Sequence, residues 1–314
     1  MVCLLHNRRK YTQEQIVPVT GGVWADFDLS KTGANVANVQ LVDTASAYLS
    51  NQPLRCYGIV PMADGSLLIS AEGQGHGYVW GFSSGHSFEL SNVNSFYSSR
   101  TGSFSSFYCI VFNADGTAFY RQSGGTQAVY LQPLGSAYNI GTAGSATTIL
   151  NSYYQGLVVN PAYFLFSTDG KKLFYKGSTN NTLYSISFDE AWPTASPATW
   201  SLQAKSLAGF DTSISGTTNT WNGFTLSPDG KCIVATTNLQ VVKFVLSTPW
   251  DISTMTLHSS KSLLDDVRSV SGDSNVSVTL AGVAINDAGT KMIVHNRANG
   301  TTAKCRFFEY NLVV

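Results

Sequence analysis

The hydrophobic positions of this 314-residue chain fall in short runs separated by turns rich in Gly, Ser, Thr, Asn and Asp. Short apolar runs bounded by turn residues predict β-strands rather than helices. Five four-residue units each join one apolar run to the next, namely Met62–Gly65, Asn113–Gly116, Ser167–Gly170, Ser227–Gly230 and Asn286–Gly289. Their final glycines are 51, 54, 60 and 59 residues apart, which predicts a repeated supersecondary unit.

The unit Ser227-Pro228-Asp229-Gly230 shows why the chain should turn here. Proline sets φ at the second position of a type I turn, and glycine takes the left-handed conformation that lets the chain return antiparallel. Each unit therefore predicts a hairpin. Cys109–Phe112 is an example of its first strand, and Lys172–Tyr175 is an example of its second.

A third apolar run follows each hairpin, at Tyr78–Phe82, Ala128–Leu131, Thr182–Ile186, Val241–Leu246 and Arg306–Tyr310. A more variable fourth segment leads to the next hairpin. Four antiparallel strands repeated every ~50 residues are typical of β-propeller blades. We therefore predict an all-β fold in which residues 1–314 form a single β-propeller domain.

The blade count depends on how the N-terminal region is interpreted. Val23–Ser30 resembles a third strand without its own hairpin, which predicts six four-stranded blades, with seven as the alternative. Residues 1–52 would then form the first blade and a closure strand, and residues 53–314 would form five hairpin repeats. The last copy ends with its third strand. We expect an N-terminal segment such as Val2–Leu5 to supply the missing outer strand, which would close the ring and remove an exposed sheet edge.

Val245–Thr254 reads Val-Leu-Ser-Thr-Pro-Trp-Asp-Ile-Ser-Thr, and less complete copies lie at Ser187–Trp192 and Ser136–Thr142. Together with the Ser-Pro-Asp-Gly turn, this element resembles a family of tandem β-propeller repeats found in phage structural proteins and in aquatic bacteria. The resemblance covers most of the chain as repeats, and the copy from Ser227 to Thr254 matches best. It implies a propeller fold and suggests a structural role in a phage particle.

Charge composition narrows the set of partners. Charged residues make up 12% of the chain, and 19 basic residues balance 19 acidic ones. Proteins that grip nucleic acid usually show a basic excess, so no nucleic-acid partner is expected. The basic run Arg8-Arg9-Lys10 is interpreted as a solvated turn.

The N-terminus and the cysteines bear on location. Met1–Lys10 places apolar residues before basic ones, the reverse of a secretory signal, and no apolar stretch approaches the ~18 residues of a membrane span. We expect no signal peptide and no membrane insertion.

The five cysteines are odd in number and widely separated, which indicates buried thiols made in a reducing cytoplasm. They are Cys3, Cys56, Cys109, Cys232 and Cys305.

The first strands should line the central channel, where propeller enzymes usually work. They contain no Asp, Glu, His, Lys or Arg at Tyr57–Pro61, Tyr108–Phe112, Tyr163–Phe166, Asn222–Leu226 and Ala281–Ile285. A hydrolase needs an acid or base, a metal or an activated nucleophile, so we expect no catalytic residue and no enzymatic activity. The residues that lie six positions before the turn aspartate, or before its equivalent Ala288, are mostly small, which fits crowding near the axis. They are Gly58, Cys109, Tyr163, Gly223 and Gly282.

Metal and cofactor sites are not predicted. No histidine pair has metal-ligand spacing among His6, His76, His86, His258 and His295. His76 and His86 are interpreted as surface residues, and Asp26 and Asp28 as a solvated strand face. Each hairpin has at most one turn aspartate, which indicates turn formation rather than a calcium loop: Asp64, Asp115, Asp169 and Asp229. Gly73–Gly77 has no helix after it and is not interpreted as a phosphate loop.

Aromatic residues are the abundant side chains that could form a binding surface, with 15 Tyr, 17 Phe and 6 Trp. Most should pack between blades. The candidates for an exposed binding surface are Trp192, Trp200, Trp221 and Trp250, although Trp250 also fits a packing role at a blade corner.

We expect a non-enzymatic structural or adhesive propeller in a phage virion, at the tail, a fibre or the capsid surface. It would be made in the host cytoplasm. Its partners would be other virion proteins, copies of itself or a host surface glycan. A bacterial protein-interaction scaffold in the cytoplasm is the first alternative, and a lactonase-like propeller hydrolase is the second.

Overall fold

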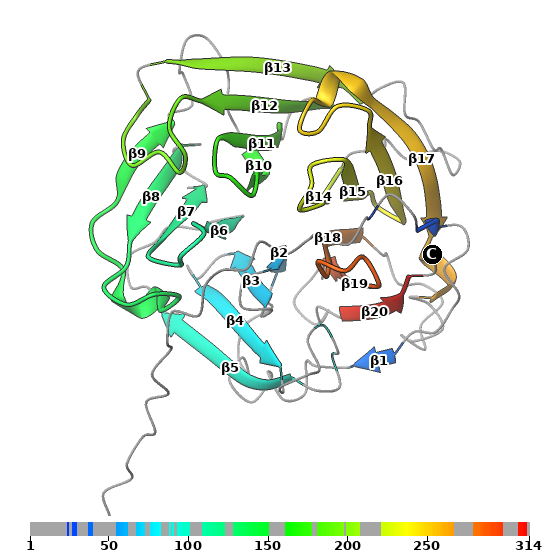
Figure 1. The fold of residues 1–314 in the computed structure, drawn as a ribbon. Coiled ribbons are helices and arrows are strands. Elements are labelled where there is room, and N and C mark those ends of the chain that lie inside the picture. Colours follow the sequence, from blue (N-terminus) through cyan, green and yellow to red (C-terminus); the bar gives the residue numbers. More distant parts are fainter. Residues whose placement is uncertain are drawn as a thin grey trace, which may run out of the picture.

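In the computed structural model, the described residues are 24, 27–29, 37–39, 55–61, 67–72, 76–82, 88, 90, 93–100, 109–122, 128–150, 161–177, 181–197, 199–207, 221–266, 279–297 and 307–312. They form five four-stranded antiparallel sheets that stand like blades around a common axis (Figure 1). The predicted all-β propeller is confirmed at this level. In the described part of the chain, no helix has the length and hydropathy needed to cross a membrane.

Four of the sheets use consecutive strands, running in chain order from the axis to the rim (Figure 1). The first contains β2 (Arg55–Pro61), β3 (Leu67–Glu72), β4 (His76–Phe82) and β5 (Val93–Arg100). The second contains β6 (Ile110–Phe112), β7 (Ala118–Gln122), β8 (Val129–Pro133) and β9 (Thr147–Leu150). The third contains β10 (Pro161–Phe166), β11 (Lys172–Gly177), β12 (Thr182–Phe188) and β13 (Trp200–Ser206). The fourth contains β14 (Gly223–Leu226), β15 (Cys232–Thr236), β16 (Gln240–Leu246) and β17 (Met255–Ser262).

The fifth sheet takes its strands from both ends of the chain. It contains β18 (Thr279–Ile285), β19 (Lys291–Arg297) and β20 (Phe307–Asn311), and its outer strand is β1 (Ala37–Val39). Asn38 of β1 pairs antiparallel with Phe308 of β20. An N-terminal strand therefore lies beside the last strand, but it is Ala37–Val39. The predicted Val2–Leu5 lies outside the described residues.

The prediction of six blades, with seven as the alternative, is wrong, because the described residues form five sheets. The error comes from Val23–Ser30, whose described residues Trp24 and Phe27–Leu29 lie in no strand. Instead, the Trp24 indole N–H donates to the carbonyl oxygens of Asn286 and Asp287, at 3.1 and 3.3 Å. Trp24 and Phe27–Leu29 therefore belong to a corner that precedes the outer strand of the fifth blade.

The predicted hairpins are present at the repeated turns. In the described turns the final glycine has φ between 68° and 70°, the left-handed region that favours glycine. The Gly230 N–H donates to the Ser227 carbonyl at 3.0 Å, and an Asp229 carboxylate oxygen accepts from the Lys231 N–H at 3.0 Å. The turn sequence therefore fixes both the reversal of the chain and the register of the strands that follow.

The core lies between neighbouring blades and is rich in aromatic rings. Tyr120 of the second sheet packs 4.4 Å from Phe166 of the third, centroid to centroid, and Phe166 packs 5.0 Å from Trp192. Offset aromatic pairs of this kind add to the stabilisation from burial. Cys109 and Cys232 are buried free thiols, as predicted, and burial raises the pKa of each to about 12.

Candidate functional site

The innermost strands pack closely around the axis. A Cβ placed on Gly282 would lie 2.6 Å from Nε2 of His295 and 2.8 Å from Cγ2 of Ile59, and one on Gly223 would overlap the Ala281 carbonyl. The crowding predicted from small residues at this register is therefore present at these two glycines. β2 begins at Arg55, before the predicted Tyr57, so the innermost strands include one basic residue that the sequence boundaries left out.

Tyr163 departs from the small-residue pattern and reaches across the axis. Its hydroxyl donates to the carbonyl oxygen of Ile59 at 2.9 Å, although β10 belongs to the third sheet and β2 to the first. Its ring lies 5.3 Å from that of Phe224 in the fourth sheet. The side chain is fully buried, and burial raises the pKa of its phenol well above the usual value. Tyr163 is therefore a permanent hydrogen-bond donor that fills the axis at this level.

His295 is a buried group that no sequence motif marks as functional. It lies on β19, its Nδ1 is 3.5 Å from the Asn296 carbonyl, and its Nε2 has no hydrogen-bond partner among the described residues. Burial lowers the pKa of the imidazole to about 4, so the ring is neutral near pH 7. The signal that could have found it is its position six residues after Gly289, at the level of the crowded axis.

The same position in other blades also holds a buried polar side chain. The buried polar residues that lie six positions after a turn glycine are Gln122, Lys176, Thr236 and His295. The Thr236 hydroxyl donates to the Ala281 carbonyl at 2.8 Å and so joins the fourth blade to the fifth. Burial lowers the pKa of the Lys176 ammonium. Polar groups near the axis therefore come from second strands as well as from the first strands, to which Arg55 and Tyr163 belong. The prediction from sequence considered only the first strands.

Among the described residues, the segments between third and fourth strands form a repeated corner, and in the second, third and fourth blades its aromatic ring lies against the glycine of the hairpin turn. Its aromatic residue has positive φ in four blades, at Phe88, Tyr138, Trp192 and Trp250. The Trp250 N–H donates to the Gly230 carbonyl at 2.9 Å, and the Trp250 ring lies against the Gly230 Cα so closely that no Cβ would fit. The copies that looked degraded in sequence, such as the one containing Tyr138, therefore keep the same packing role.

Polar residues next to the aromatic stabilise two of these corners. Asp251 accepts hydrogen bonds from the Ser253 N–H at 3.0 Å and the Ser253 hydroxyl at 2.6 Å, and Asn139 accepts from the Gly141 N–H at 3.1 Å. The Ser253 hydroxyl is the main cause that lowers the pKa of Asp251. These groups cap a single turn of 3₁₀ helix, which is a structural role.

The four predicted binding tryptophans occupy different environments. Trp192 and Trp250 are half-buried against turn glycines, and Trp221 is only 5% exposed, with its ring 5.1 Å from that of Phe244. Trp200 is half-buried at the start of β13, opposite Phe188. Much of the surface of these four rings is therefore covered by packing. Trp221 is buried, so it cannot form one exposed surface together with the other three. A binding role for the four stays a prediction.

The remaining sequence candidates are placed as follows. The Asp115 carboxylate accepts from the Thr117 N–H and hydroxyl, at 3.0 and 2.7 Å, and these bonds lower its pKa in a turn role. The Asp169 carboxylate accepts from its own turn in the same way. His258 is exposed on β17. Asp28 is half-buried and lies in no strand, so the interpretation of a solvated strand face is wrong for this residue. The other candidates lie outside the described residues or have undescribed side chains: His6, Asp26, Asp64, His76 and His86.

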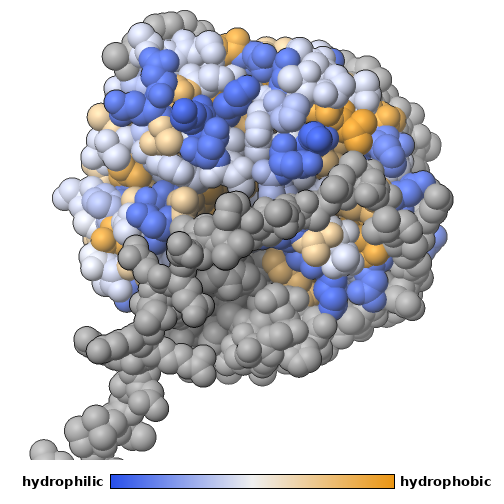
Figure 2. Space-filling view, in the orientation of Figure 1, coloured by the Kyte–Doolittle hydropathy of each residue, from blue (hydrophilic) through white to orange (hydrophobic). Residues whose placement is uncertain are grey.

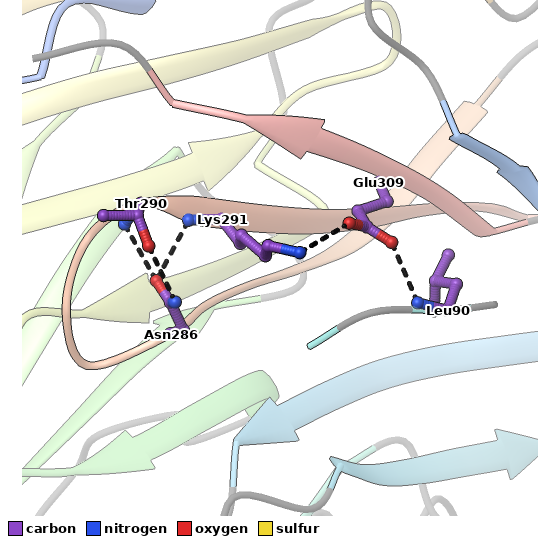
Figure 3. Close-up of polar contacts among 5 residues, drawn as sticks. All are labelled: Leu90, Asn286, Thr290, Lys291 and Glu309. Atoms are coloured by element: carbon purple, nitrogen blue, oxygen red, sulfur yellow. Dashed lines mark hydrogen bonds and ion pairs between the residues drawn. The ribbon is translucent and has the colours of Figure 1, made fainter. Parts of the chain in front are cut away.

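The last blade contacts the first through a buried carboxylate. Glu309 of β20 accepts from the Leu90 N–H at 2.8 Å with one oxygen, and its other oxygen lies 3.2 Å from the Lys291 Nζ (Figure 3). Asn286, at the hairpin turn of the same blade, accepts from the N–H groups of Thr290 and Lys291. The Asn286 side chain therefore fixes the backbone of Lys291, and the Glu309 carboxylate fixes its ammonium group.

No protein-family model and no curated protein matches the chain. Solved structures similar to it include a luciferin-regenerating enzyme, with 11% identity, a TM-score of 0.44, and coverage of 81% of this chain and 76% of that one. They also include a nidogen/laminin complex, with 9% identity, a TM-score of 0.44, and coverage of 77% and 72%. Another is the Cps50 (Swd1) β-propeller domain from Myceliophteria thermophila, with 11% identity, a TM-score of 0.41, and coverage of 82% and 71%. No family is assigned to the chain on this basis.

Proposed function

We propose that this chain is a non-enzymatic β-propeller that serves as a structural or adhesive component of a phage virion, at the tail, a fibre or the capsid surface. The supporting observation is the hydrogen bond from Tyr163 to Ile59 across the axis. This bond joins two innermost strands through a buried side chain, which supports a packing role for that part of the axis. The resemblance of Ser227–Thr254 to repeats of phage structural proteins supports the particle role.

The rim offers surface for docking to neighbours. β13 and β17 are outer strands with mostly exposed or half-exposed residues. Leu257 on β17 is 43% exposed, the one large hydrophobic residue strongly exposed in the described part. Hydrophilic and hydrophobic residues are interspersed over the described surface in Figure 2. A polar rim with strand edges suits contacts with other virion proteins, with copies of the chain or with a host glycan.

Mass spectrometry of purified particles tests the proposal directly. Phage particles from the strain that encodes the chain are banded in a density gradient and washed in high salt. We expect the chain at a copy number comparable with known structural proteins. Its absence from intact, infectious particles overturns the virion role. Co-purification with bacterial proteins in phage-free cells would instead support the scaffold alternative.

A rim variant with a matched control locates the docking surface. Leu257→Lys places a charge on the exposed part of β17, whereas Glu190→Lys places one at an exposed corner of the third blade. Both variants should fold, because both side chains are exposed. We expect particle incorporation to fall for Leu257→Lys and to stay unchanged for Glu190→Lys. Equal incorporation of both variants would exclude β17 as the docking surface.

A further inference from the structure

Two buried charges occupy the same register position in neighbouring blades. Lys243 on β16 pairs with Val234, four residues after the turn glycine of the fourth sheet. Glu309 on β20 pairs with Ile293, four residues after the turn glycine of the fifth sheet. Lys243 is 0% exposed and Glu309 is 6% exposed. Charged side chains are rarely buried to this degree unless a specific partner compensates them.

Each charge contacts the corner of the next blade. The Lys243 Nζ donates to the Phe27 carbonyl and lies 4.0 Å from the centre of the Phe27 ring. Glu309 accepts from the Leu90 N–H (Figure 3). Phe27 belongs to the N-terminal corner that completes the fifth blade, and Leu90 belongs to the corner of the first blade. Lys243 therefore uses a carbonyl oxygen from its neighbour, and one oxygen of Glu309 uses an N–H group from its neighbour, while the other Glu309 oxygen pairs with Lys291 of the same blade.

The equivalent positions in the second and third blades hold uncharged residues. These are Leu131, which pairs with Tyr120, and Ser185, which pairs with Phe174. Among the positions of this register whose side chains the structure describes, the charges therefore lie only in the two seams that flank the fifth blade. That blade is the one assembled from both ends of the chain.

Ring closure is where similar blades can choose the wrong neighbour. Apolar seams accept any blade of similar shape, and exchange of an identical element between copies is a known route to swapped dimers. A buried charge is a weak source of net stability, but leaving it without its partner is costly, so it discriminates between neighbours. The N-terminal corner also makes the Leu29 N–H bond to the Ser259 hydroxyl, at 3.2 Å, which places it against the same fourth blade.

We propose that Lys243 and Glu309 select the neighbours of the fifth blade, so that the chain closes on its own N-terminal corner and first blade rather than on those of a second copy. Lys243 recognises the Phe27 carbonyl on one side of that blade, and Glu309 recognises the Leu90 N–H on the other. Both are specificity-determining residues for ring closure.

Refolding of the full chain over a range of protein concentrations tests this selection. The variants are Lys243→Leu, which copies the residue at the same register in the second blade, and Glu309→Gln. Lys176→Met is the control, since Lys176 is a buried lysine outside this register. Oligomer size is measured by light scattering after size-exclusion chromatography. We expect mostly monomer for the wild type and the control, and a dimer fraction raised about tenfold in Lys243→Leu.

Tagged and untagged copies distinguish a swapped dimer from a surface dimer. Swapped dimers should form mixed species only when the two copies are refolded together, whereas surface dimers exchange when folded proteins are mixed. Glu309→Gln keeps an acceptor for Leu90 and should show a smaller rise in swapped dimer. Folded, monomeric Lys243→Leu and Glu309→Gln would overturn the proposal. Failure of both variants to fold, under conditions where the wild type folds, would also overturn it, because the charges would then act on stability rather than on partner choice.

Discussion

The hydroxyl of Tyr163 donates a 2.9 Å hydrogen bond to the carbonyl of Ile59, which lies 104 residues earlier in the chain and on the far side of the axis. Tyr163→Phe removes the donor and leaves the Ile59 carbonyl buried without it. We expect the free energy of unfolding to fall by about 1–3 kcal/mol, measured by urea denaturation. Tyr138→Phe is the control, because its hydroxyl bond to the Ala114 carbonyl is exposed. Equal stability of Tyr163→Phe and the wild type would contradict a filled axis.

His295 predicts a loss of stability in mild acid. Its pKa is about 4 in the fold and about 6.5 in the unfolded chain, so between these values the unfolded chain binds more protons. Stability therefore falls as pH falls from about 6.5 to 4, by about 3 kcal/mol in total, and the effect levels off below pH 4. His295→Gln should lack this component. Carboxylate effects are common to both proteins, so the difference between their denaturation midpoints, measured across this range, isolates the histidine. If the stabilities of the wild type and His295→Gln changed in parallel with pH, the predicted contribution of His295 would be contradicted.

Gly230 combines positive φ with direct contact to the Trp250 ring. Gly230→Ala adds a methyl group where the backbone conformation is strained and the space is occupied. We expect a loss of about 2–5 kcal/mol in the free energy of unfolding. Gly144→Ala is the matched control, since its nearest neighbour would be the Pro133 side chain at 3.4 Å, an ordinary contact. Differential scanning calorimetry should show a large fall in Tm for the first variant and a small one for the second.

Cys109 and Cys232 should resist alkylation in the folded protein. Both are fully buried, and burial raises the pKa of each thiol to about 12, so almost no thiolate forms at pH 8. Iodoacetamide labelling, analysed peptide by peptide by mass spectrometry, should modify the two residues only after unfolding. Rapid labelling of either thiol under native conditions would show that the blade around it opens readily.

The hairpins could be predicted from sequence because a local signal encodes them. The turn ending at Gly230 contains its own φ preference and its own side-chain cap, so neighbouring residues suffice. The small residues Gly223 and Gly282 likewise indicated a crowded axis. The blade count failed at Val23–Ser30, because alternating apolar residues fit a strand and a corner equally well. What decides between them is Trp24 binding the turn at Asn286, more than 250 residues away.

The axial chemistry was only partly accessible from sequence. The uncharged stretches of the first strands were visible in the sequence, but β2 begins at Arg55. The span of Tyr163 depends on where the first blade lies relative to the third. His295 could be predicted to lie on a second strand, but not to face Gly282 with an unpartnered nitrogen. The corner aromatics were underestimated because Tyr138 does not match the Trp-Asp-Ile pattern, although it takes the same backbone conformation as Trp250. Different aromatic side chains therefore take the same backbone conformation at this corner.

The pairing of β1 with β20 has a consequence for synthesis on the ribosome. Ala37–Val39 leaves the ribosome long before its partner Phe307–Asn311, because synthesis proceeds toward the C-terminal side. The four sheets of consecutive strands can form in turn as translation proceeds, whereas the fifth must wait until Phe307–Asn311 has emerged. During that time the early strand has no edge of its own blade to join. Of the five described sheets, the fifth is therefore the last that can be completed, and the interval before its completion sets how long an incomplete ring is exposed to other chains in the cell.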